Sequence, residues 1–210
     1  RSTSSLSPGE VGDLRHAVAQ RHAEAYGASV TIVAGASTIS TGRLDLVWLS
    51  PEIVGGLLDR ALAELDGVAI SHVWVADNDG LLRLRHRQAE ADPTQAPWLL
   101  RAIVERASRA LVGHIGFHGA PGVNALAAED AVELGYTVEP AHRRLGYARE
   151  AVLGMMEWAR GEHGIRRFLA SVNPSNEPSL GLVRKLGFVP IARVQDDDGG
   201  EEIVFELVQE

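Results

Sequence analysis

The spacing of hydrophobic residues in the first half of the chain predicts one strand followed by two helices. Residues 44–49 alternate between two sides, as a strand does. Ser50 followed by Pro51 is a helix start, and apolar residues at helical spacing continue from there to Leu65. A second, more polar helix is predicted over residues 81–91.

In the middle of the chain, apolar residues recur every second position, as in a strand, and no longer at helical spacing. Residues 98–105 and 110–118 are predicted to be two strands joined by a short polar turn, after a loop that ends at Pro97. A third strand over residues 131–138 is almost continuously apolar, with Glu133 as its one carboxylate.

The last third of the chain alternates between the two periods. The strongest helical pattern covers residues 148–162, where apolar residues fall at i, i+3, i+4, i+7 and i+11. The remaining elements are a strand, a helix that Gly187 ends and a terminal hairpin, at residues 168–172, 176–186, 188–194 and 203–207. This order predicts an α/β fold in which a mixed sheet carries helices on both faces.

The first 40 residues do not share this regular pattern. We treat residues 1–40 as an N-terminal extension, with a weak helical pattern over residues 9–26 and a short strand over residues 29–34. The main domain is predicted to begin at Thr41 and to cover residues 41–210. A content of 45% hydrophobic and 23% charged residues is that of a folded globular chain.

Charge and composition exclude several classes of function. A net charge of −8 argues against a surface for duplex nucleic acid. The absence of cysteine removes disulfides, thiolate zinc sites and cysteine nucleophiles, and no metal site is predicted. No apolar run reaches the roughly 18 residues of a membrane span, and no signal peptide is recognisable. We therefore expect a cytoplasmic protein, monomeric or homodimeric, with no membrane partner.

The loop before the strongest helix carries the clearest chemistry. It reads Arg143-Arg144-Leu145-Gly146-Tyr147-Ala148. A helix start offers unpaired amides and the positive end of the helix dipole, which together suit a phosphate or pyrophosphate group. Gly146 lets an anion approach the backbone closely. The alternative is a plain connection with solvated arginines.

The pattern Arg143-x-x-Gly146-x-Ala148 resembles the Gln/Arg-x-x-Gly-x-Gly/Ala signature of the GNAT superfamily of N-acetyltransferases. Further matching segments are Glu133-Leu134-Gly135-Tyr136, Asn176-Glu177-Pro178-Ser179, Lys185-Leu186-Gly187-Phe188 and the opening Arg43-Leu44-Asp45-Leu46 with Ser50-Pro51. Together they resemble the branch that includes the ribosomal-protein N-terminal alanine and serine acetyltransferases. The resemblance spans residues 41–207.

This resemblance implies a splayed sheet that holds acetyl-CoA, the acetyl donor. The loop amides from Arg143 to Ala148 would bind the pyrophosphate. The edge of the third strand at Tyr136, Thr137 and Val138 would pair with the pantetheine arm, and an amide near Val138 would polarise the thioester carbonyl. Asn176 matches a residue that contacts the arm, although it is equally suited to cap a helix.

The catalytic step needs a base and a proton donor. An acceptor ammonium group must lose a proton before it attacks, and Glu133 is the first candidate for the base because burial raises the pKa of a carboxylate. An edge-facing glutamate paired with an arginine is the other interpretation of Glu133. His114, His118 and a water relay are alternative bases, although a core or surface histidine is the simpler interpretation of each imidazole.

Ser179, one turn after Asn176, is a candidate donor to the departing thiolate, and a first-turn serine that bonds its own backbone is the alternative. Many relatives carry a tyrosine as general acid where Val183 stands here, and this difference leaves the general acid unassigned.

The resemblance implies direct attack by a primary amine within a ternary complex. The acceptor that it favours is a peptide or protein N-terminus, and the acidic residues 196–202 are candidates for steering a basic peptide. A solvated turn is the simpler interpretation of these acidic residues. The alternatives for the whole protein are a small-molecule amine acetyltransferase and a non-catalytic acyl-CoA-binding module.

Overall fold

The computed structural model describes residues 31–32, 38–62, 64–65, 67–195 and 200–209. Within them a nine-stranded mixed sheet has the order β1-β2-β3-β6-β7-β8-β9-β11-β10. Its strands are β1 (Thr31–Ile32), β2 (Thr38–Ser40), β3 (Leu44–Trp48), β6 (Arg101–Glu105), β7 (Ala110–Phe117), β8 (Ala131–Val138), β9 (Arg167–Val172), β10 (Val189–Gln195) and β11 (Glu201–Val208). Neighbouring strands are antiparallel except β8 and β9, which are parallel.

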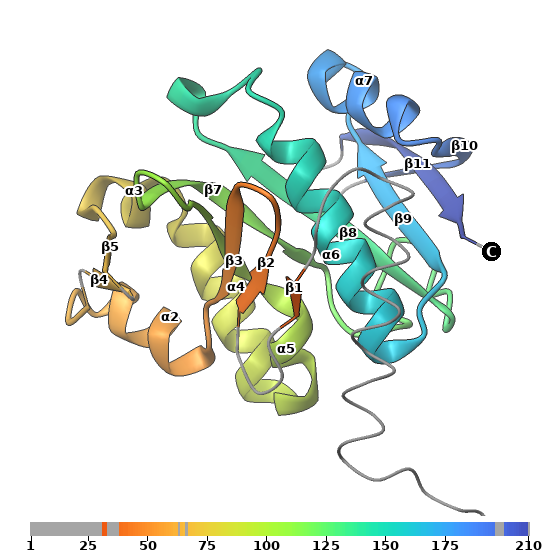
Figure 1. Cartoon of the computed structure of the whole chain (residues 1–210). Coiled ribbons are helices and arrows are strands. Elements are labelled where there is room, and N and C mark those ends of the chain that lie inside the picture. The colour runs from red at the N-terminus through yellow and green to blue at the C-terminus, as the bar shows by residue number, and fades with distance from the viewer. Residues whose placement is uncertain (1–30, 33–37, 63, 66, 196–199, 210) are drawn as a thin grey trace, which may run out of the picture.

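Helices cover both faces of this sheet, as the order of elements predicts. The helices are α2 (Pro51–Leu58), α3 (His72–Asp77), α4 (Asp79–Ala91), α5 (Ala96–Leu99), α6 (Tyr147–His163) and α7 (Glu177–Lys185). Alternate residues of β3 enter two separate cores: Leu44 and Leu46 pack with α6 and α7, whereas Val47 packs with α2, α4 and α5. In Figure 1, α6 crosses in front of the sheet and α4 lies behind it. Within the described residues no helix is long and apolar enough to cross a membrane.

Helix α2 is shorter than its apolar spacing predicts. It ends at Leu58 rather than at Leu65, because Arg60 adopts a left-handed conformation with φ 57°. The two amides that follow Arg60 donate to the carbonyl of Gly56 at 2.8 and 3.0 Å and close the helix. Leu65 instead belongs to a separate small hairpin, β4 (Glu64–Leu65) and β5 (Val68–Ala69). Apolar spacing predicted the burial of Leu65 but not its conformation.

The strand predicted from residue 98 begins at Arg101. The carboxylate of Asp92 accepts the amide of Thr94 at 3.0 Å and starts a 3-10 turn, Pro93–Gln95, which leads directly into α5. Trp98 lies on this helix and packs edge-on against Trp158, with ring centroids 5.2 Å apart. The predicted loop before residue 98 is therefore helical.

The second half of the chain follows the pattern closely. Strand β8 has the predicted bounds, and α6 begins at Tyr147, one residue earlier than predicted. The predicted helix over residues 9–26 lies outside the described residues. Strand β2 pairs with β3, so the sheet includes residues that precede Thr41.

The two parallel strands diverge, and this divergence positions the site. Only Ala131–Glu133 of β8 pair with Arg167–Leu169 of β9. Strand β8 continues to Val138 and β9 continues to Val172 without further pairing between them. A splayed mixed sheet is therefore present, as the resemblance implies.

Candidate active site

Beyond Glu133, strand β8 is bonded on one side only. The carbonyl of Glu133 accepts the amide of His118, the residue after β7, at 2.8 Å, and the amide of Glu139 donates to the carbonyl of Val112 in β7 at 2.9 Å. Because backbone groups alternate in direction along a strand, the amides of Tyr136 and Val138 point toward the gap beside β9. Thr137 pairs with β7, so its backbone faces away from the gap and only its exposed side chain is free to contact a ligand.

The loop after β8 leads to the N-terminus of α6 at this open edge. Residues 143–146 are exposed, and Arg143 donates from Nε to the carbonyl of Val138 at 2.9 Å. Arg144 and Gly146 have φ values of 64° and 85°, which turn the chain sharply before the first helical residue. The first amides of α6 have no acceptor within the helix. The loop therefore presents backbone donors and two arginines beside the strand edge.

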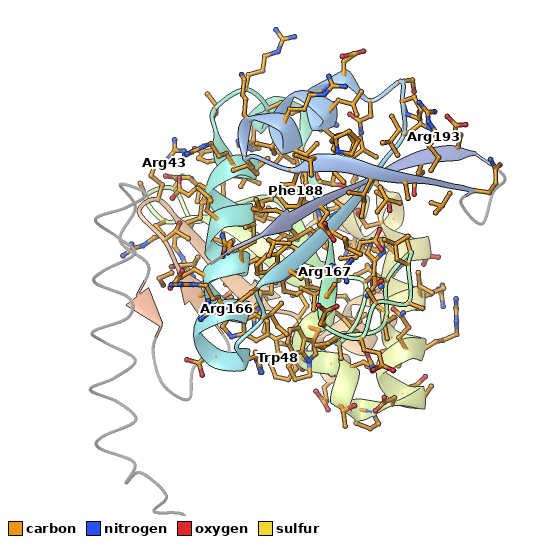
Figure 2. All side chains as sticks on the ribbon, turned by 90° about the vertical axis from the view of Figure 1, so that its right-hand side faces the viewer. Arg43, Trp48, Arg166, Arg167, Phe188 and Arg193 are labelled. Carbon is orange, nitrogen blue, oxygen red and sulfur yellow. The ribbon has the colours of Figure 1, made fainter. Side chains whose placement is uncertain are left out.

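Hydrogen bonds from Thr41 and Arg43 to Glu150, called the brace below, hold this loop. The sequence patterns did not indicate these contacts. The carboxylate of Glu150, in the first turn of α6, accepts Thr41 Oγ1 at 2.6 Å and the amide and Nε of Arg43 at 2.6 and 2.8 Å. Arg43 also donates from Nη1 to the carbonyl of Leu145 at 3.0 Å and lies 4.8 Å from the ring centre of Tyr147. Figure 2 shows Arg43 beside this end of α6. The matching Arg-Leu-x-Leu segment was the one available signal for Arg43.

Helix α7 approaches the same gap. Asn176 Oδ1 accepts the amide of Ser179 at 3.2 Å, so this side chain caps α7. The hydroxyl of Tyr136 is buried and has no hydrogen-bond partner of acceptable geometry among the described residues. Burial raises the pKa of Tyr136, and the nearby Ser179 lowers it. Val183 is only 2% exposed and belongs to the core.

Glu133 does not face the open gap. It is 1% exposed, and its Oε2 accepts the amide of Ala125 at 2.6 Å. Its Oε1 lies 3.6 Å from Nδ1 of His118, whose side chain is 41% exposed. A Cβ atom on Gly135 would lie 3.2 Å from Nε2 of His118. The imidazole therefore stands between the carboxylate and the surface and rests against the backbone of β8.

Two more charged or titratable residues, Arg85 of α4 and His114 of β7, lie near His118 and Glu133. Arg85 donates from Nη1 to the carbonyl of His118 at 2.9 Å. Burial, the larger effect, and Arg85 lower the pKa of His118, whereas Glu133 raises it. His114 is 7% exposed and lies edge-on to Trp74, with ring centroids 6.2 Å apart. Burial and Arg85 lower its pKa to about 4.

These residues fit a long anionic ligand with a peptide-like arm. The open edge at Tyr136 and Val138 offers backbone pairing, and the N-terminus of α6 offers an anion site at one end of that edge. The unpartnered hydroxyl of Tyr136 lies on the same stretch of strand. Among the described residues, no three His, Asp or Glu side chains converge as metal ligands. The expected contacts of the individual residues with a ligand stay predictions.

Known proteins share this sequence pattern. The family model for the acetyltransferase (GNAT) domain matches residues 70–189, more than half of the chain. The uncharacterized N-acetyltransferase YjdG of Bacillus subtilis is 32% identical over 87 residues, which are 41% of this chain and 49% of YjdG. The matched segment thus spans about half the length of this relative.

Solved structures share the fold. A proposed ribosomal-protein-serine acetyltransferase from Vibrio cholerae superposes with a TM-score of 0.57 at 20% identity, over 82% of this chain and 97% of that one. A proposed GNAT-family acetyltransferase from Bordetella pertussis gives 0.57 at 22% identity, over 81% and 99%. Together with the matching family model, the splayed sheet and the loop at the start of α6 identify this chain as a member of the GNAT acetyltransferase family.

Proposed function

We propose that this protein transfers the acetyl group of acetyl-CoA to a primary amine, by direct attack within a ternary complex. The observation that carries this proposal is the open edge of β8 that runs into the N-terminus of α6. Acetyl-CoA supplies an activated acetyl group on a long arm that ends in a pyrophosphate. A strand edge joined to a helix N-terminus is complementary to both parts of such a molecule.

The loop residues supply the anion site in this proposal. The amides from Arg143 to Ala148 bind the pyrophosphate, with Arg143 and Arg144 adding positive charge. Arg143 is already anchored through Nε to the carbonyl of Val138, which leaves its terminal nitrogens for the ligand. The brace between Arg43 and Glu150 keeps the carbonyl of Leu145 turned away from the anion, because Arg43 Nη1 binds that carbonyl.

The gap between β8 and β9 holds the arm and the reacting end. The amides of Tyr136 and Val138 pair with the amides of the arm, and one of them polarises the thioester carbonyl. Asn176 lies across the gap at the start of α7. Ser179 and the unpartnered hydroxyl of Tyr136 are the two side-chain donors proposed for the departing sulfur.

We infer that the acceptor is a peptide or protein N-terminus. Support comes from the matched motifs and from the Vibrio cholerae structure, whose description names a ribosomal-protein-serine acetyltransferase. Of the acidic residues proposed to steer a basic peptide, Asp196, Asp197 and Asp198 lie outside the described residues. Glu201, which pairs with Arg193, and Glu202 are the first two residues of β11 in the terminal hairpin. Figure 2 shows Arg193 near the tip of this projecting hairpin.

The test is an assay of CoA release against a panel of acceptors. The protein is incubated with acetyl-CoA and basic peptides that begin with Ser or Ala, the same peptides with blocked N-termini, and spermidine. The chain has no cysteine, so a thiol reagent reports only the CoA that is released. We expect turnover with free N-termini and none with blocked ones. Turnover with spermidine alone would indicate a small-molecule enzyme, and binding of acetyl-CoA without turnover would indicate a binding module.

A further inference from the structure

The proposed reaction needs a base, and the geometry of Glu133 is unsuited to direct contact with the acceptor. An alkylammonium group has a pKa of about 10, so at neutral pH it must lose a proton before its nitrogen can attack. Glu133 is 1% exposed, and one of its oxygens is committed to the amide of Ala125 at 2.6 Å. Its other oxygen faces His118. A proton from the acceptor reaches this carboxylate only past the imidazole.

His118, unlike Glu133, has a side chain that is exposed enough to contact an acceptor. Its side chain is 41% exposed, and its Nε2 lies against Gly135 on β8, two residues beyond the last residue of that strand that pairs with β9. With the pyrophosphate at α6, an arm that runs back along β8 brings its thioester end toward this point of divergence. The ring thus stands at the reacting end of the gap, on the face that α4 covers.

We propose, on the basis of the proposed function above, that His118 is the base that accepts the proton of the acceptor amine at Nε2 and that Glu133 is the positioning residue that holds Nδ1. The two side chains lie 3.6 Å apart, a separation that catalytic pairs commonly shorten when substrate is bound. A carboxylate behind Nδ1 selects the tautomer in which Nε2 carries the lone pair, and it stabilises the imidazolium that forms.

The proton balance follows from this assignment. The amine nitrogen forms the bond to the acetyl carbon, and the carbon–sulfur bond breaks. The ammonium group loses two protons in reaching the amide. One passes to Nε2 of His118 and then to water, and the other ends on the CoA sulfur, with Ser179 and Tyr136 as the nearby donors.

Burial, the larger effect, and Arg85 of α4 lower the pKa of His118 below the ordinary value of about 6.5, and Glu133 of β8 opposes them. The lowered pKa favours the neutral imidazole at neutral pH. His114 lies on the same face, four residues before His118, but it is 7% exposed and packed against Trp74. His114 is therefore a matched control: it shares the face with His118, and it is buried away from the gap.

The first experiment compares substitutions of His118 and His114. His118→Gln should lower kcat/KM by about 10²–10⁴-fold, the usual contribution of a general base. Its affinity for acetyl-CoA, followed by the ligand-induced rise in the thermal midpoint, should stay that of the parent, which also shows that the variant is folded. Added imidazole should restore part of the activity to His118→Gly. His114→Gln should stay within a few-fold of the parent.

The second experiment uses the pH profile, which a merely structural role would not move. A base must be deprotonated, so kcat/KM of the parent should fall as pH drops through the pKa of His118, below about 6.5. Glu133→Gln removes the charge that raises this pKa and should shift the acidic limb to lower pH. Arg85→Gln removes the charge that lowers it and should shift the limb to higher pH, whereas Arg85→Lys should leave the limb in place.

The outcomes separate this assignment from the proposed function. Two results with an active parent would overturn the role of His118 alone. One is activity of His118→Gln within a few-fold of the parent, and the other is an acidic limb that neither Glu133→Gln nor Arg85→Gln moves. A parent that binds acetyl-CoA and acetylates no amine would overturn the proposed function, and this role with it. A loss of activity in His118→Gln with intact acetyl-CoA binding and imidazole rescue supports both.

Discussion

At the scale of single residues, two glycines shape the site. Gly146 has φ 85°, a conformation that favours glycine, and a Cβ atom there would lie 3.3 Å from Nη2 of Arg43. Gly135 leaves the room in which the imidazole of His118 rests. At both positions the absence of a side chain lets another residue approach the backbone of the proposed ligand site, Arg43 at Gly146 and His118 at Gly135.

Gly146→Glu tests the anion site at this scale. The new carboxylate puts bulk and negative charge at the start of α6, in a backbone conformation that strains any larger residue. We expect acetyl-CoA to raise the thermal midpoint of the parent but not that of this variant, because only a ligand that binds the folded state stabilises it.

Gly161→Glu is the matched control for this prediction. It adds the same charge to the same helix at an exposed position with open space around the Cβ atom. The control should keep the full response to acetyl-CoA. An equal response in Gly146→Glu would show that the pyrophosphate is bound elsewhere.

At the scale of elements, one carboxylate joins the turn between β2 and β3 to the first turn of α6. Glu150 accepts three hydrogen bonds from Thr41 and Arg43, residues more than a hundred positions earlier in the chain. Burial raises the pKa of Glu150, and these hydrogen bonds together outweigh it, so its pKa lies below the usual value. The stabilisation therefore requires the ionised carboxylate.

Glu150→Gln should remove this pH-dependent stabilisation. For a carboxylate whose pKa is lowered by folding, the contribution is present above the unfolded pKa of about 4.3 and is lost as pH falls through the folded value. The parent should thus have the higher thermal midpoint at neutral pH, and the difference should shrink below pH 4.3 or so. Exposed Glu129→Gln should change the midpoint little at either pH. A difference that persists unchanged in acid would contradict the ionic role of Glu150.

At the scale of the whole molecule, the layers approach closely at one point of the sheet. Gly116 of β7 is buried, and a Cβ atom there would lie 1.6 Å from the carbonyl oxygen of Leu99, at the end of α5. At this contact the helical layer behind the sheet packs on β7, which carries His114 and ends directly before His118. The geometry of the proposed base thus depends on the packing of an entire layer.

Gly116→Ala should therefore destabilise the protein strongly. The added methyl group meets backbone atoms, which cannot rotate away, and overpacking of this kind costs typically about 1–3 kcal/mol or more. Gly161→Ala in α6 meets open space and should stabilise the helix by about 0.5–1 kcal/mol. Chemical denaturation of both variants checks the pair. Equal stability of Gly116→Ala and the parent would show that α5 and β7 shift apart without cost.

Local patterns in the sequence determined most of the elements and the loop of the site. The bounds of β8, the start of α6 within one residue and the cap at Asn176 follow from apolar spacing, glycine and capping residues, which act between neighbours in the chain. The same reasoning placed Glu133 and His118 on two predicted strands as candidate bases. It failed at the end of α2, where apolar spacing continues past the turn at Arg60, and at α5, where an expected strand is helical.

Only the tertiary structure decided which residues act together. The register between β7 and β8 brings His118 over Glu133 and turns the backbone of Thr137 away from the gap. The packing of α4 adds Arg85 to that pair, and the turn before β3 brings Arg43 to Glu150. These contacts join segments far apart in the chain, and they depend on strand register and layer packing, which spacing along one segment does not encode. The fold and the candidate residues of the loop were therefore readable from the sequence, whereas the pairing of His118 with Glu133 and the brace between Arg43 and Glu150 were not.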